Sequence, residues 1–239
     1  MRNSEARFLS CLYVLSLTLL VLYAAHGLRN AVTVSAETVP QRTVILDAGH
    51  GGPDGGASTS DGVKESDINL AVALKTDAVL GLLGCKTVLT RTSDRDLSED
   101  GAVSISQKKI SDIRNRVNMV NATGQGILIS IHQNTFPGES CRGAQVFYGN
   151  VGNSQNLAEQ LQLAFHEQLD SGGNRTAKPI SADVYLMNHI ETPGVLVECG
   201  FLSNPEEAAL LQKQDYQKRI AALIAVTVEN YLSEEDTDV

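Results

Sequence analysis

The sequence predicts an α/β fold, a single domain whose parallel sheet carries helices on both faces. From Arg42 onward, short apolar runs alternate with stretches of helical periodicity, which is typical of a parallel sheet wrapped by helices. Two of these runs, residues 126–131 and 195–197, are apolar enough for strands buried on both faces. The chain contains neither an internal repeat nor a Pro/Ser-rich linker, so we expect one domain over residues 42–232.

The elements of the first half follow from apolar spacing and from turn residues. Apolar residues recur at helical spacing over residues 66–83, and Gly84 is suited to end that helix. The polar, irregular stretch 93–109 predicts a loop. In chain order, we expect strand 43–46, helix 66–83, strand 86–90, loop 93–109, helix 110–121 and strand 126–131.

In the second half, the clearest signal is a helix start at Asn204. Asn204 is a good N-cap, Pro205 fits the first helical position, and the two glutamates that follow suit the helix dipole. In chain order, we expect strand 144–148, helix 154–169, strand 195–197, the helix that opens at Asn204, helix 215–232 and an acidic C-terminal tail, 233–239.

Composition excludes several classes of protein. The 239 residues are 42% hydrophobic and 20% charged, which is ordinary for a globular protein. The formal net charge of −9 opposes binding to phosphate backbones, so we expect no nucleic-acid partner. The four cysteines include no C-x-x-C pair, which argues against a Cys-rich zinc finger and a thioredoxin-type motif.

The N-terminal segment has the pattern of an export signal. Arg2 and Arg7 precede an uncharged apolar run over residues 8–25, and residues 34–36 offer a small-residue cleavage site. We therefore expect residues 1–36 to be either a cleaved signal peptide or a retained N-terminal membrane anchor, and the pattern does not distinguish the two. In either case, the preceding arginines place the rest of the chain outside the cytoplasm.

Four ionisable side chains stand where predicted strands end or a helix begins. His50 follows the first strand, Glu65 directly precedes the first helix, and His132 follows the strand over residues 126–131. Glu198 follows the strand over residues 195–197. Open α/β sheets bind ligands at the carboxyl ends of their strands, so we expect these groups to share one crevice if the strands are neighbours.

Two imidazoles and a carboxylate form the ligand set of a catalytic zinc site that keeps its fourth position open for water. We therefore assign His50, Glu65 and His132 as ligands of one zinc ion. Glu198 would act as the base that takes a proton from water and later as the acid that protonates the leaving amine. Asp47 or Asn134 could orient the ligands from behind.

Structural interpretations compete with this assignment. A histidine in a glycine loop is more often a turn residue than a ligand, and Glu65 could simply complement the start of its helix. Residue types alone therefore leave both interpretations open. A buried carboxylate directly after residues 195–197 is harder to explain without a partner.

Other catalytic and binding motifs fit poorly. Asp54 replaces the third glycine of a G-x-G-x-x-G loop, which argues against nucleotide binding, and Ser130 lacks a G-x-S-x-G elbow. Cys199 is best interpreted as a small core residue. We expect four further polar residues to lie on the surface, with one of the arginines able to pair with a carboxylate: His166, His189, Arg114 and Arg116.

Several separated motifs resemble the zinc-dependent N-acetylmuramoyl-L-alanine amidases, which cut the bond between muramic acid and the first L-alanine of peptidoglycan. They are LDAGHGG at 46–52, the glutamate of KESDINLAVALK at 64–75, LTR at 89–91, RVNMVN at 116–121, SIHQN at 130–134 and VLVECGFLSNPEE at 195–207. The resemblance implies a twisted, mostly parallel sheet flanked by helices. It also implies zinc at His50, Glu65 and His132 and a catalytic Glu198.

Within that family, the chain most resembles the germination-specific amidases of spore-forming bacteria, which act on spore cortex on the way to muramic-lactam. The features are one hydrophobic leader before a bare catalytic domain, Phe136-Pro137 after SIHQN, and the stretch over residues 187–207. The resemblance implies a peptidoglycan substrate and a location outside the membrane or in the forespore intermembrane or cortex space.

The chain also departs from patterns found elsewhere in the family. It carries no wall-binding repeats and no long helical insertion that would block the site, and an acidic chain is not held passively by an anionic wall. We therefore expect targeting through a membrane tether at residues 8–25 or through an activating or targeting partner protein. Two alternatives stay open, a non-catalytic peptidoglycan-binding module and a zinc peptidase that acts on the stem peptide.

Overall fold

A computed structural model describes residue 18 and residues 42–99, 101–169 and 175–237. The chain divides into two units, Met1–Val39 and Pro40–Val239. The expected leader, residues 1–36, and its cleavage site lie outside the described residues, except for Thr18. No helix in the described part of the chain is long and apolar enough to cross a membrane.

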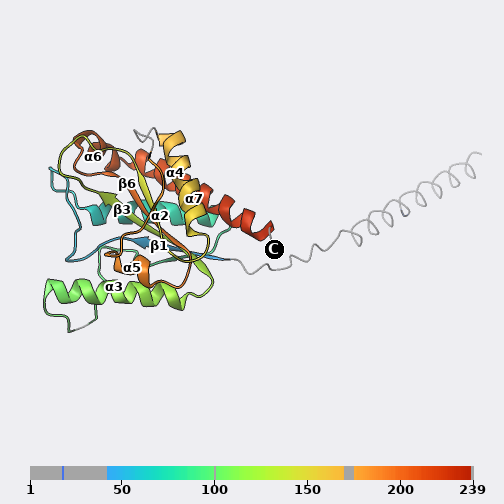
Figure 1. Cartoon of the computed structure of the whole chain (residues 1–239), viewed down its shortest axis with the longest axis horizontal. Coiled ribbons are helices and arrows are strands. Elements are labelled where there is room, and N and C mark those ends of the chain that lie inside the picture. Colours follow the sequence, from blue (N-terminus) through green and yellow to red (C-terminus); the bar gives the residue numbers. More distant parts are fainter. Residues whose placement is uncertain (1–17, 19–41, 100, 170–174, 238–239) are drawn as a thin grey trace, which may run out of the picture. The chain divides into compact units, whose positions relative to one another are not determined.

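One mixed sheet organises the second unit (Figure 1). Its described strands lie in the order β2-β1-β3-β6-β4-β5, and all neighbours are parallel except β4 and β6. The predicted α/β class and the mostly parallel sheet are therefore confirmed. The strands are β1 (Thr43–Ala48), β2 (Thr87–Leu89), β3 (Gly126–Asn134), β4 (Gln145–Tyr148), β5 (Lys178–Pro179) and β6 (Gly194–Phe201).

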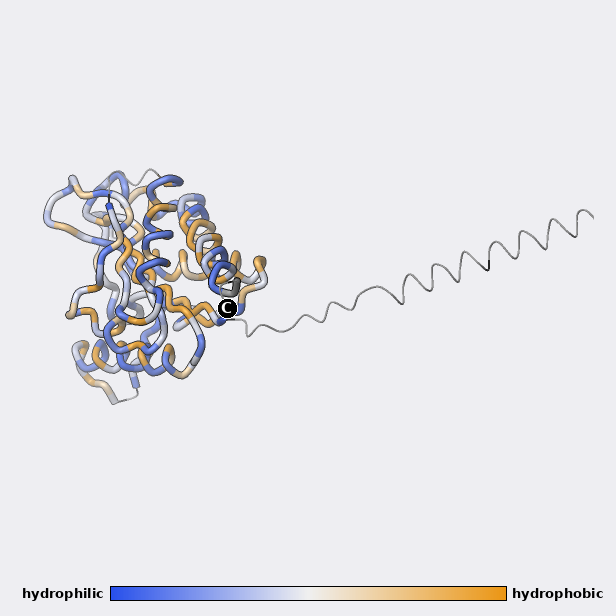
Figure 2. Tube along the Cα trace, turned by 45° about the vertical axis from the view of Figure 1, so that its right-hand side comes forward, coloured by the Kyte–Doolittle hydropathy of each residue, from blue (hydrophilic) through white to orange (hydrophobic). Residues whose placement is uncertain are grey.

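Helices cover both faces of the sheet, because successive strand side chains point to opposite sides. Val44 and Leu46 of β1 pack in the larger core with α2, α4 and α7. Ile45 packs in the second core with α3 and α5. Figure 2 shows hydrophobic residues along the strands between these helices. The helices are α2 (Glu65–Leu82), α3 (Ile105–Ala122), α4 (Ser154–Leu169), α5 (Tyr185–His189), α6 (Pro205–Leu211) and α7 (Gln214–Thr237).

The start of α3 differs from the prediction, which placed a loop over residues 93–109. The helix begins at Ile105 because Ser104 and Gln107 form a capping box. The Ser104 hydroxyl accepts a hydrogen bond from the Gln107 N–H, and the Gln107 side chain accepts one from the Ser104 N–H. The polar composition of this turn therefore reflects a cap and not a loop.

The end of α7 also differs, since the expected acidic tail, 233–239, is helical as far as Thr237. Glu235 explains this extension. Its carboxylate accepts a hydrogen bond from the Tyr231 hydroxyl at 2.7 Å and from Asn153 at 2.9 Å, and it forms an ion pair with Arg42. These contacts hold the last turn against the domain.

Two strands extend further than predicted, and two short elements were not predicted. β3 continues to Asn134 and β6 to Phe201, so His132 and Glu198 lie inside their strands and not after them. The reason is their direct pairing in the ladder between β3 and β6. The short β5 and α5 carry too few residues to show a periodic pattern.

Candidate metal centre

The three predicted ligands converge, although they lie far apart along the chain. His50 follows β1, Glu65 is the first residue of α2, and His132 lies near the end of β3. One ligand atom from each lies within 4.8 Å of the other two. Glu65 Oε1 is 3.3 Å from His50 Nε2 and 3.0 Å from His132 Nδ1. Two imidazole nitrogens and a carboxylate oxygen therefore lie close enough together to hold one metal ion, and they are the ligand types of a catalytic zinc site.

Glu198 lies beside this cluster because its Cα pairs with that of His132 across two parallel strands. Its Oε2 atom is buried and has no hydrogen-bond partner among the described residues. Burial raises the pKa of Glu198 to about 7, and the charge of Glu65 adds to this rise while His132 opposes it. A carboxylate with a near-neutral pKa can both accept and return a proton. The donor set and this free acceptor together fit a zinc ion.

Glu65 is held in place by main-chain donors as well as by the histidines. The Ala57 N–H donates to its Oε2 at 2.9 Å, and the Gln133 N–H donates to its Oε1 at 3.1 Å. Asn69, one turn further along α2, donates to Oε1 at 3.3 Å. Burial alone would raise the pKa of Glu65, but hydrogen bonds from His132 and His50 outweigh burial and keep it well below its usual value. The Glu65 side chain is therefore a carboxylate anion near neutral pH.

Asp54 orients His50, a role that was not expected from the sequence. Its Oδ2 atom lies 3.0 Å from His50 Nδ1, which directs the opposite nitrogen toward Glu65. Burial lowers the pKa of His50, but Glu65 and Asp54 reverse that effect and raise it to about 9. Since only a neutral imidazole binds a metal, metal binding near neutral pH displaces this proton.

The loop that carries His50 needs glycine at two positions where its main chain lies close to other side chains. A Cβ on Gly49 would lie 2.2 Å from the His132 ring, so a side chain there would force the ring or the loop to move. Gly56 has φ +68°, and a Cβ there would lie 2.5 Å from Glu65 Oε2. His50 itself has φ 62°, a left-handed conformation that costs a residue other than glycine free energy.

Two buried arginines hold the main chain of this loop. Arg116 donates to the carbonyl oxygens of Ala48 at 2.9 Å and His50 at 2.7 Å. Arg91 donates to the carbonyls of Ala48 and Gly49 at 2.9 and 3.1 Å. The expectation that Arg116 lies on the surface is wrong, since it is 2% exposed. Its guanidinium donates to main-chain carbonyls of this loop and does not point into solvent.

Asp47 and Asn134 do not orient the ligands directly. Asp47 is buried against Arg116, at 2.5 Å, and accepts hydrogen bonds from Ser130 and Thr90. Among the described contacts, Asn134 uses its main-chain carbonyl to accept from the Leu202 N–H. Asp47 therefore supports the loop from beneath, through Arg116.

The remaining candidates lie where the structural interpretations placed them. His166, His189 and Arg114 are exposed. Ser130 donates to Asp47 and not to a histidine, and Cys199 is 1% exposed within the larger core. Burial raises the pKa of the Cys199 thiol well above its usual value, so the reactive thiolate does not form near neutral pH.

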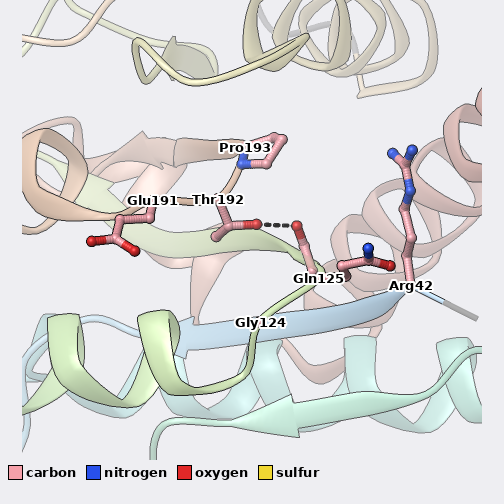
Figure 3. Close-up of a pocket in the computed structure, with 7 residues that line it drawn as sticks. Arg42, Gly124, Gln125, Glu191, Thr192 and Pro193 are labelled. Carbon is pink, nitrogen blue, oxygen red and sulfur yellow. Dashed lines mark hydrogen bonds between the residues drawn. The ribbon is translucent and has the colours of Figure 1, made fainter.

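A separate pocket of about 480 Å³ lies at the opposite ends of the strands from the candidate metal centre (Figure 3). It is formed at the amino ends of β1, β3 and β6, whereas the four predicted site residues lie toward their carboxyl ends. The residues that line it are Arg42, Gly124, Gln125, Gly126, Glu191, Thr192 and Pro193. This pocket is therefore not part of the metal centre.

Comparison with known proteins identifies a family and individual relatives to which this chain is similar. Residues 44–230 match the N-acetylmuramoyl-L-alanine amidase family. The germination-specific N-acetylmuramoyl-L-alanine amidase of Bacillus subtilis (strain 168) is 39% identical over 194 residues, which cover 81% of this chain and 81% of the relative. The amidase LytC of the same strain is 29% identical over 185 residues, which cover 76% of this chain and 34% of LytC.

Solved structures give the same result. The CwlD amidase from Clostridioides difficile, in complex with the GerS lipoprotein, has a TM-score of 0.76 and 37% identity, and the match covers 80% of this chain and 98% of that chain. The amidase AmiC2 of Nostoc punctiforme has a TM-score of 0.69 and 27% identity, with coverage of 81% and 98%. The folded domain described above is therefore matched nearly from end to end.

Proposed function

Since this chain belongs to the N-acetylmuramoyl-L-alanine amidase family, we propose that His50, Glu65 and His132 hold one zinc ion and that Glu198 transfers the proton during hydrolysis. The reaction of the family is cleavage of the amide between N-acetylmuramic acid and L-alanine in peptidoglycan. The observation that supports the assignment is the convergence of three side chains that could bind a metal, beside a buried oxygen of Glu198, Oε2, that has no hydrogen-bond partner in the described part of the chain.

Each of these residues has a distinct task. The metal, when bound, acts as a Lewis acid that acidifies a water molecule and polarises the scissile carbonyl. His50, Glu65 and His132 provide the two nitrogens and the oxygen that hold it. Glu198 accepts the proton of the attacking water at its free carboxylate oxygen and donates it to the amine of L-alanine as that amine leaves. In the metal-free chain, burial raises the pKa of Glu198 to about 7, which favours uptake of a proton by this carboxylate.

Digestion of purified peptidoglycan tests this function. The zinc-loaded chain should release stem peptides that begin with a free L-alanine amine, a chelator should stop the release, and added zinc should restore it. Mass spectrometry of the fragments shows which amide is cut. Products that keep L-alanine attached to muramic acid would identify a peptidase, and intact peptidoglycan after treatment with zinc-loaded chain would exclude catalysis.

The physiological substrate we propose is spore-cortex peptidoglycan, on the way to muramic-lactam. The support is the 39% identity to a germination-specific amidase and the likeness to CwlD. Expression in a spore-forming host that lacks its own cortex amidase should restore muramic-lactam to the cortex. Muropeptide analysis of the spores measures this directly, and cortex without muramic-lactam despite expression would exclude the role.

A location outside the cytoplasm follows from where such a substrate lies. We further propose that residues 1–36 export the chain, as a cleaved signal or as a tether through residues 8–25, ahead of a catalytic domain over residues 42–232. Fractionation and N-terminal sequencing distinguish the two forms. Because the related CwlD was solved in complex with a lipoprotein, we also propose a protein partner outside the membrane.

A further inference from the structure

A lysine from α3 reaches the carboxylate that lies behind the ligand His50. Lys109 Nζ is 2.8 Å from Asp54 Oδ1, and Asp54 Oδ2 is 3.0 Å from His50 Nδ1. The three side chains thus form a continuous series from the surface of α3 to the metal centre. Lys109 lies 55 positions beyond Asp54, and no local motif links the two.

The two oxygens of Asp54 have separate partners. Oδ2 faces His50, while Oδ1 accepts from Lys109 and, at 3.3 Å, from the Gly56 N–H. With both oxygens engaged, the carboxylate cannot turn freely. His50 then keeps Nδ1 toward Asp54 and presents Nε2 to Glu65, 3.3 Å away.

His50 needs this support because its main chain adopts a left-handed conformation in an irregular loop. The same helix supports the main chain of His50, since Arg116 of α3 donates to its carbonyl at 2.7 Å. Lys109 and Arg116 lie about two turns apart on α3. One helix therefore fixes His50 at both its carbonyl and, through Asp54, its ring.

We propose that Lys109 is a positioning residue of the metal centre, which holds Asp54 so that His50 presents Nε2 to the zinc ion. This inference rests on the proposed function, because it concerns the affinity of the same site for zinc. Lys109 does not touch the ligands itself. The Lys109 side chain is 52% exposed, and exposed ion pairs contribute little to stability, so its removal should not unfold the domain.

Zinc affinity of the full chain, measured by competition with a chromogenic chelator, tests the proposal. Lys109→Met should weaken zinc binding by a factor of about 5, the scale of a partly exposed ion pair. Asp54→Asn should weaken it roughly 10- to 100-fold, as removal of a direct partner of a ligand does. Lys109→Arg should restore the affinity of the parent, because a guanidinium can also bind Asp54.

Lys108→Met is the matched control, since Lys108 is the neighbouring residue on α3 and forms no ion pair among the described residues. It should leave zinc affinity unchanged. Thermal unfolding of the metal-free variants should match that of the parent, which separates positioning from folding. Equal zinc affinities for Lys109→Met and Lys108→Met would overturn the proposal while leaving the proposed function intact. A parent chain that binds no zinc would overturn both.

Discussion

His132 of β3 and Glu198 of β6 stand directly opposite one another in the parallel ladder of two central strands. The register shifts just beyond this pair, between His132 and Asn134. His132, which we propose as a metal ligand, and Glu198, which we propose for proton transfer, are thus fixed by main-chain hydrogen bonds and not by flexible loops. A strand is a more rigid support for such groups than a loop. Two chemically different groups therefore keep a constant separation.

Glu198→Gln should separate metal binding from turnover. Glutamine keeps the size of the side chain but cannot carry the proton, so the rate of amide hydrolysis should fall roughly 10²- to 10⁴-fold. Zinc content should stay at the parent level, because Glu198 lies outside the ligand cluster. Initial rates on purified peptidoglycan and metal analysis of the same sample measure both. Full activity of the variant would refute the role of Glu198.

His132→Ala should remove metal binding. The substitution deletes one of the three side chains whose ligand atoms lie within 4.8 Å of one another, and two ligands seldom hold zinc at neutral pH. His166→Ala, on an exposed position of α4, is the control and should keep the full zinc content. Stoichiometric zinc in purified His132→Ala would remove this histidine from the ligand set.

Gly49→Ala should damage the metal centre without touching a ligand. The new Cβ would lie 2.2 Å from the His132 ring, so the ring or the loop must move. We expect a loss of about 1–3 kcal/mol in the free energy of unfolding and weaker zinc binding. Gly81→Ala, within α2 and with no atom within 4 Å of its Cβ, should instead stabilise the fold by roughly 0.5–1 kcal/mol. Unchanged zinc affinity in Gly49→Ala would show that the loop relaxes freely.

The sequence could predict the sheet and the convergence of three of the four candidate site residues for a common physical reason. Apolar strands are recognisable from composition, and the carboxyl ends of parallel strands lie on the same side of a sheet. His50, His132 and Glu198 could therefore be placed in one crevice from the sequence alone. The start of α3 could also be predicted, because Ser104 and Gln107 have the spacing of a capping box. The polar residues around this pair instead indicated a loop.

The supporting residues could not be predicted in the same way. Arg116 and Lys109 reach the loop of His50 from a helix more than fifty residues away, and only the packing of α3 on the sheet brings them there. Asp54 lies four residues from His50, but their contact crosses a turn in which His50 adopts a left-handed conformation that the sequence does not reveal. Such contacts follow from tertiary structure and not from local spacing.

The buried pair of Asp47 and Arg116 should make the stability of the domain depend on acidity. Burial raises the pKa of Asp47, but Arg116 and Ser130 outweigh burial and lower it to about 2. An unfolded aspartate titrates near pH 4, so the stabilisation, about 2 kcal/mol, is fully present above pH 4 and is lost as the pH falls to 2. The free energy of unfolding in urea, measured between pH 2 and 6 with a chelator to remove metal, should fall by this amount as the pH is lowered.

Asp47→Asn isolates this contribution. The variant should lose about 3–5 kcal/mol near neutral pH, because Arg116 keeps its charge in the interior without that partner. It should also show a smaller loss of stability on acidification than the parent, since the titrating group is gone. Asp215→Asn, whose carboxylate is 92% exposed, is the control and should change stability by less than about 0.5 kcal/mol. If Asp47→Asn and the parent lost equal stability between pH 4 and pH 2, another carboxylate would be responsible.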